Sequence, residues 1–196
     1  MKPRKAIASI VLLALAAASG CAQGPPPTFY ILDARASPAL AGVERGVAVG
    51  VGPVTLPAHL DRPQIVTRAG DYRLDLSEAN HWAEPLKGTI ARVVSVHLAN
   101  ELQSNRVYVL PRRERTPLDY QVVIDFERFD GVLGEAAVVV ARWSVLDGEG
   151  GARRITRLSI VTEPTADGGY EALVASSSRA LERLSLEIAA AIAAGS

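Results

Sequence analysis

Few of the side chains that do chemistry in enzymes form a catalytic pattern in this sequence. The three histidines are scattered at His59, His81 and His97. No H-E-x-x-H motif or carboxylate at metal-ligand spacing accompanies them, so we predict no metal site. Asp75 and Ser77 lie near His81, but a catalytic triad is defined by geometry and not by nearness in the chain.

Other candidate catalytic groups are equally isolated. Glu78 and Glu84 could serve as a general acid and base, but solvated or capping carboxylates are the more common role for such residues. The sequence contains neither a G-x-S-x-G elbow nor an S-x-x-K motif. We therefore predict a protein that is not an enzyme, with no catalytic residues and no cofactor.

Cys21 is the residue whose type and position predict a specific chemistry. It is the only cysteine, and it follows the small residues Ala18-Ser19-Gly20. The 13 uncharged residues Ala6–Ala18 come before it. Such a segment is too short to span a bilayer, which needs roughly 20 apolar residues, but it suits the core of a secretory signal.

A basic start completes the leader, because Lys2, Arg4 and Lys5 precede the apolar core. The whole leader resembles a bacterial lipoprotein signal, in which the cysteine becomes the acylated N-terminus. Ala18 stands where that signal usually has Leu. The alternative is an ordinary signal cleaved nearby, with Cys21 an incidental thiol. Acylation predicts a protein anchored to a membrane without crossing it.

These features divide the chain into three parts. Residues 1–20 are the predicted lipoprotein signal peptide, and residues 21–28 hold the lipidated Cys21 and a proline-rich linker. Pro25-Pro26-Pro27 favours an extended polyproline II spacer, although a disordered leader with no spacing role is the alternative. Residues 29–196 form one predicted domain.

Composition excludes several classes of protein. The chain is 48% hydrophobic, so it is not a disordered polar chain. Its 21 basic and 21 acidic side chains argue against a polybasic nucleic-acid binder, and a single cysteine excludes a disulfide framework. Loss of the leader leaves 18 basic and 21 acidic groups, a net charge of −3.

Two amphipathic helices are predicted. The first covers Glu84–Gln103, where apolar residues recur at every fourth position. Pro85 suits its first turn, where a missing amide costs little. The second covers Tyr170–Ala193 and follows Gly168-Gly169. Both helices need a surface to cover.

Alternating apolar residues predict that surface. A meander of three antiparallel strands is expected from Tyr120 to Thr162, with turns at Gly131–Gly134 and Asp147–Gly151. Shorter strands are expected at Phe29–Leu32, Gly46–Val51, Tyr72–Leu76 and Val107–Leu110. In Gly46–Val51 the glycines share one face, which predicts close approach of a helix or another backbone. We predict an α+β fold: a mainly antiparallel, mixed sheet with both helices packed on one face.

The stretch between the early strands and the first helix carries two motifs. P-V-T-L-P-A-H-L-D-R-P-Q-I-V spans Pro53–Val66, and H-W-A-E-P-L spans His81–Leu86. With the lipoprotein cysteine before them, these motifs closely resemble the ABC-type transport auxiliary lipoprotein family of the PqiC-like type. The resemblance covers roughly Phe29–Ala193.

The resemblance implies a subunit of an MCE-type system that moves lipids between the two membranes of a cell envelope. It implies a partner, the MCE-domain protein, and attachment to the periplasmic face of the outer membrane. Ala22 agrees by analogy, because it is not the aspartate associated with retention at the inner membrane. The family supplies no catalytic residues to transfer.

The motif residues allow two interpretations. They form either a partner-binding patch or a structural corner, since prolines, a tryptophan and paired charges suit a rigid turn as well. Arg62 is a candidate for a bidentate contact with a carboxylate such as Glu84, and Trp82 for an anchor against the sheet. The candidate residues are Leu60, Asp61, Arg62, Pro63, Gln64, Trp82, Glu84 and Pro85.

The sequence leaves three candidate functions for the protein. The first is a lipid-anchored transporter subunit that acts through protein–protein contact and needs no nucleic acid. The second is a lipid-binding shuttle that holds phospholipid in an apolar cavity between helices and sheet. The third, a periplasmic hydrolase, lacks a nucleophile–base pair. Self-association suits a docking subunit, but the sequence gives no stoichiometry.

Overall fold

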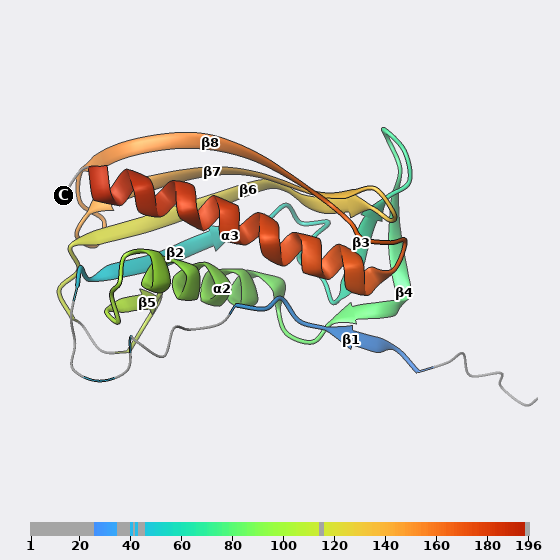
Figure 1. The fold of residues 1–196 in the computed structure, drawn as a ribbon, viewed down its shortest axis with the longest axis horizontal. Coiled ribbons are helices and arrows are strands. Elements are labelled where there is room, and N and C mark those ends of the chain that lie inside the picture. The colour runs from blue at the N-terminus through green and yellow to red at the C-terminus, as the bar shows by residue number, and fades with distance from the viewer. Residues whose placement is uncertain (1–25, 35–39, 41, 43–45, 114–115, 195–196) are drawn as a thin grey trace, which may run out of the picture.

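The residues that the structure describes fold into two β-sheets and two long helices (Figure 1). The structure is a computed structural model and describes residues 26–34, 40, 42, 46–113 and 116–194. Cys21 and the predicted signal peptide lie outside the described residues. In chain order the elements are β1 (Thr28–Tyr30), β2 (Val49–Thr55), β3 (Gln64–Arg68), β4 (Leu74–Trp82), α2 (Leu86–Glu101), β5 (Val107–Val109), β6 (Tyr120–Val132), β7 (Ala136–Asp147), β8 (Arg153–Pro164) and α3 (Tyr170–Ala194).

The predicted meander is confirmed as the centre of the larger sheet. Strands β6, β7 and β8 pair antiparallel along nearly their whole length, with Ile124 opposite Trp143 and Val140 opposite Ile160. Strand β6 continues to Val132, past the expected start of its turn. The chain reverses around Gly134, whose positive φ of 79° is readily adopted by glycine.

Strand β2 makes this sheet mixed. It pairs in parallel with β5 on one side and with β6 on the other, which gives the order β5-β2-β6-β7-β8. A parallel pair needs a long crossover, and β3, β4 and α2 supply it between β2 and β5. The predicted α+β class, with a mainly antiparallel mixed sheet, is confirmed.

The glycine face of β2 is covered by a neighbouring segment. A Cβ atom at Gly50 would lie 2.6 Å from Cδ1 of Leu118 and 2.8 Å from Cδ1 of Leu110. One at Gly52 would lie 3.0 Å from the backbone oxygen of Leu110. The predicted close approach therefore occurs, and the connection between β5 and β6 makes it.

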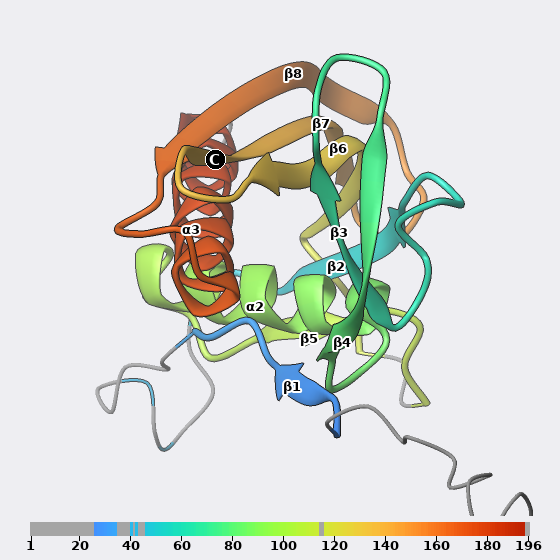
Figure 2. The same ribbon diagram turned by 90° about the vertical axis from the view of Figure 1, so that its right-hand side faces the viewer.

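A smaller sheet was not predicted from the sequence. Its strands are ordered β1-β4-β3, with β1 parallel to β4 and β3 antiparallel to it. The β3–β4 hairpin stands beside the end of the larger sheet (Figure 2). Asp130 of β6 ties the two sheets together through Arg68 of β3, at 3.1 Å. The expected strand Tyr72–Leu76 is thus the first part of a longer strand that ends at Trp82.

Both helices lie on one face of the larger sheet (Figures 1 and 2), as predicted. The stripe of α2 is buried, with Ile90, Val94 and Leu98 each 0% exposed. Helix α2 begins at Leu86 and not at Glu84, and Pro85 is its N-cap with ψ of 122°. The helix starts late because the preceding backbone still pairs with the small sheet, where the Ala83 amide donates to the Tyr30 carbonyl at 2.8 Å.

Side chains fill the space between the helices and the sheet. Trp143 of β7 is fully buried against the layer that contains Leu184 and Ile188 of α3. Its Nε1–H donates to Ser159 at 2.8 Å, so the one polar atom of the indole is satisfied. None of the helices in the described part of the chain is long and apolar enough to cross a membrane.

Candidate functional site

The small sheet brings the two sequence motifs together. Gln64 at the start of β3 pairs with His81 near the end of β4. Next to this pair, the Trp82 amide donates to the Pro63 carbonyl at 2.7 Å. Strand pairing therefore places the L-D-R-P-Q segment against the W-A-E-P-L segment, although 18 residues separate Pro63 from Trp82 in the chain.

Two buried apolar side chains fix this junction to the core. Leu60 is 2% exposed, and its amide closes a turn onto the Pro57 carbonyl at 2.9 Å. Trp82 is 8% exposed, and its ring packs against Phe129 of β6 at a centroid distance of 6.4 Å. Trp82 thus makes the sheet contact expected of an anchor. Rigid packing of this kind holds a site in one geometry.

A pocket of about 320 Å³ opens at the junction. We call it the Arg62 pocket. Its apolar wall is made by Trp82, Leu86 and three exposed or partly exposed small residues, and its polar wall by three charged side chains. The lining residues are Asp61, Arg62, Pro63, Trp82, Ala83, Glu84, Pro85 and Leu86.

The two carboxylates of the pocket are already paired with cations of helix α2. Lys87 Nζ lies 2.7 Å from Oδ2 of Asp61. Arg92 lies 3.6 Å from Oε2 of Glu84, which also accepts a hydrogen bond of 3.3 Å from the Thr89 hydroxyl. Both ion pairs are about half exposed, so they contribute little to stability. They do leave both carboxylates neutralised.

The expected contact between Arg62 and a carboxylate is absent. Among the described residues, the Arg62 side chain has no hydrogen-bond or ion-pair partner, and its Nε is buried without one. The physical reason is competition: Lys87 and Arg92 project from the first two turns of α2 and reach Asp61 and Glu84. Arg62 is left as the one cation of the pocket without a counter-charge within the described chain.

The predicted site residues separate into three groups. Six of them line the pocket: Asp61, Arg62, Pro63, Trp82, Glu84 and Pro85. Leu60 lies beneath it in the core, and Gln64 is a strand residue beside it. Cys21 lies outside the described residues. The prediction missed the lining role of Ala83 and Leu86, which the second motif contains.

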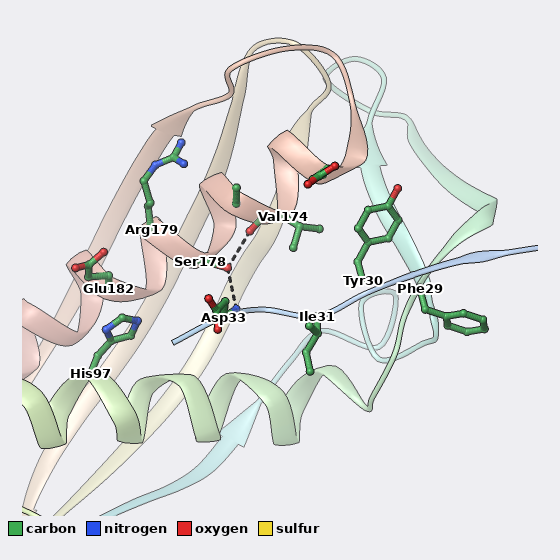
Figure 3. A pocket seen from close by; sticks show the side chains of 11 residues that line it. Phe29, Tyr30, Ile31, Asp33, His97, Val174, Ser178, Arg179 and Glu182 are labelled. Atoms are coloured by element: carbon green, nitrogen blue, oxygen red, sulfur yellow. Dashed lines mark hydrogen bonds between the residues drawn. The ribbon is translucent and has the colours of Figure 1, made fainter. Parts of the chain in front are cut away.

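A second hollow, the α2–α3 groove, was not predicted. It encloses about 620 Å³ between helix α3, His97 of α2 and the segment that begins with β1 (Figure 3). The Asp33 amide donates to the Ser178 hydroxyl at 3.2 Å, which holds that segment beside α3. Three distant stretches of chain build this groove, and no local pattern reveals it.

The walls of the groove are mixed in character. Tyr30 and Val174 lie toward one end of the groove, and Arg179 and Glu182 lie further along α3 (Figure 3). Burial lowers the pKa of His97, and the nearby carboxylates of Glu182, Glu101 and Asp33 oppose that shift. Among the described residues, no cluster of three metal-binding side chains occurs here or elsewhere.

The residues considered for catalysis do not form a relay. Ser77 accepts hydrogen bonds from the amide and the side chain of Asn80, at 3.0 and 2.8 Å. Asp75 pairs with Arg73 at 3.5 Å. His81 Nε2 is buried without a partner in the described chain. No hydrogen bond joins these three residues within the described residues.

Comparison with solved structures shows the same fold in other proteins. A crystal structure of an uncharacterized protein is 18% identical, covers 86% of this chain and 99% of its own, and has a TM-score of 0.70. A protein from Xanthomonas campestris assigned to DUF330 is 22% identical, covers 83% and 92%, and has a TM-score of 0.66. At these identities the likeness concerns the fold alone. No protein of curated function matches the sequence.

Comparison with protein families identifies the chain more directly. Residues 30–189 match the model of the family described as "ABC-type transport auxiliary lipoprotein component". The match includes strands β2 to β8, helix α2, most of helix α3 and every residue of the Arg62 pocket. Because it covers most of the chain, this protein belongs to the ABC-type transport auxiliary lipoprotein family.

Proposed function

We propose that this protein is the lipid-anchored subunit of an MCE/ABC-type system that moves lipids between the membranes of a cell envelope. It is attached through acylated Cys21 to the periplasmic face of the outer membrane. It acts by contact with the MCE-domain protein and not by catalysis. Family membership supports the transport role, and the leader sequence supports the anchor.

The Arg62 pocket is the proposed contact surface. The observation that carries this assignment is that eight residues from two separate motifs line one pocket that is open to solvent. The charge of Arg62 also supports this assignment, because its side chain makes no hydrogen bond or ion pair within the described chain.

Isolation of the complex tests this proposal. The full-length protein, tagged at its C-terminus, would be purified in mild detergent from cells that also express the MCE protein, the permease and the ATPase. We expect the MCE protein to be recovered with it. Failure to recover any of the three, from cells in which all are expressed, would contradict the proposal.

The alternative of a lipid-binding shuttle has weaker support. The space between helices and sheet, where such a lipid would lie, is filled by side chains such as Trp143 and Leu184. The α2–α3 groove is open and carries charged residues on its walls. Native mass spectrometry that found a phospholipid retained at one per chain would favour the shuttle.

A further inference from the structure

We propose that the Arg62 pocket binds a carboxylate of a protein partner, presented next to an apolar side chain. This inference rests on the proposed function, because it names the chemistry by which the same pocket recognises its partner. The carboxylate is bound by the Arg62 guanidinium, and the apolar side chain lies against Trp82 and Leu86.

The charge of the pocket selects an anion. Asp61 and Glu84 are neutralised by Lys87 and Arg92, so Arg62 leaves the pocket with one net positive charge. The pocket also adjoins the N-terminus of the 16-residue helix α2, whose N-cap Pro85 makes no side-chain capping bond. The positive end of the helix dipole adds to the attraction for an anion.

The number of charges favours a carboxylate over a phosphate. One guanidinium forms two parallel hydrogen bonds with one carboxylate, so donor and acceptor numbers match. A phosphate carries more negative charge than the single unpaired cation of the pocket can balance.

The size and walls of the pocket indicate what stands next to the carboxylate. A volume of about 320 Å³ is at the small end for a ligand site, so it suits one side chain and not a two-chain lipid. Trp82 and Leu86 are 8% and 3% exposed and form a firm apolar wall. A fitting ligand is therefore a residue such as leucine at a chain terminus, or an apolar residue beside an aspartate or glutamate.

Arg62 is expected to matter for binding and not for folding. Its side chain makes no hydrogen bond or ion pair with the described residues, so Arg62→Gln removes no such contact from the free protein. The melting temperature should stay within a few degrees of wild type. Arg153→Gln, an exposed arginine on β8 away from the pocket, is the matched control.

The two tryptophans allow binding to be followed at the site. Trp82 lines the pocket, while Trp143 is fully buried elsewhere and serves as an internal reference. The full-length protein, labelled with fluorotryptophan and held in detergent micelles, would be titrated with N-acetyl-leucine and followed by fluorine NMR. Trp82→Phe assigns the two signals. N-acetyl-leucinamide, which lacks the charge, is the ligand control.

We expect N-acetyl-leucine to shift the Trp82 signal saturably and to leave the Trp143 signal in place. The amide should bind at least about tenfold more weakly, and Arg62→Gln should weaken binding of the acid by a similar factor. Arg153→Gln should bind as the wild type does. Equal shifts with acid and amide, equal binding by Arg62→Gln, or no shift at all would overturn the proposal. Tighter binding of dihexanoyl phosphatidylglycerol than of N-acetyl-leucine would overturn it in favour of a lipid headgroup.

Failure of the carboxylate site can be distinguished from failure of the proposed function. If the MCE protein is recovered with the wild type and equally with Arg62→Gln, the carboxylate site is wrong and the transport role stands. If N-acetyl-leucine binds through Arg62 but no MCE protein is recovered, the site stands and its assignment to that partner fails.

Discussion

Asp130 shows how one buried charge joins the two sheets. Its side chain is 1% exposed and lies between Arg68 of β3, at 3.1 Å, and Arg128 of β6, at 2.6 Å. Burial alone would raise the pKa of Asp130, but hydrogen bonds and attraction from the two arginines outweigh it and hold the pKa below its ordinary value. Folding therefore stabilises the ionised form.

The first prediction follows from the lowered pKa of Asp130. Because the pKa is lower in the folded protein, the contribution of Asp130 to stability is complete above the unfolded pKa of about 3.9 and is lost as the pH falls through the folded value. At neutral pH, Asp130→Asn should lower the free energy of unfolding by about 1.5 to 3 kcal/mol, since it removes a buried charge that hydrogen-bonds to two partly exposed arginines. Urea denaturation at several pH values measures both effects.

A matched control separates burial from charge. Asp75 pairs with Arg73, but both side chains are more than half exposed, so Asp75→Asn should change stability by less than about 0.5 kcal/mol. The difference between Asp130→Asn and wild type should shrink as the pH falls below about 4. A difference that stayed constant from neutral to acid pH would contradict the role given to the ionised carboxylate.

At the scale of single elements, replacing glycine by alanine is expected to have opposite effects on stability at two positions. Gly131, next to the last residue of strand β6, has no room for a Cβ atom, which would clash with the Ala136 backbone and lie 2.6 Å from Cδ1 of Leu173 of α3. Gly88, in the first turn of α2, has nothing within 4 Å of that position. The difference comes from packing, because Gly131 lies between the neighbouring strand β7 and helix α3.

The second prediction compares the same substitution at both positions. Gly131→Ala should lower the free energy of unfolding by about 2 kcal/mol or more, because the strand or the helix must shift. Gly88→Ala should raise it by about 0.5 to 1 kcal/mol through better helix propensity. Thermal unfolding of the two variants measures both. Destabilisation by Gly88→Ala would show that α2 packs differently at its start.

The elements also show what sequence could and could not predict. Regular periodicity over many residues predicted α2, α3 and the β6–β8 meander, because their burial repeats along one chain segment. The short strands β1 and β5 were expected close to their observed positions. The strand β3, the smaller sheet and the parallel pairing of β2 were not predicted, because they depend on distant partners. The suggested contact between Arg62 and Glu84 was wrong for the same reason. The cations that pair with the pocket carboxylates, Lys87 and Arg92, lie on helix α2. The α2–α3 groove has no local signal at all.

At the scale of the whole molecule, the third prediction concerns the anchor. Cys21→Ala should abolish acylation, because it removes the only thiol in the sequence that can carry the lipid. Incorporation of radiolabelled palmitate measures acylation at the only cysteine. Ala18→Leu is the matched control and should acylate at least as well as wild type. A Cys21→Ala protein that still incorporated palmitate would contradict the assignment.

In the proposed arrangement, acylated Cys21 holds the domain at the membrane and the Arg62 pocket binds a protein partner. The most direct test is site-specific photocrosslinking in membranes. A photoreactive amino acid would replace Glu84 on the rim of the Arg62 pocket or, as a control, Thr162 on the exposed side of β8. The account predicts a crosslink to the MCE-domain protein from position 84 and none from position 162. A crosslink from position 162 alone, or none from either with the MCE protein present, would contradict it.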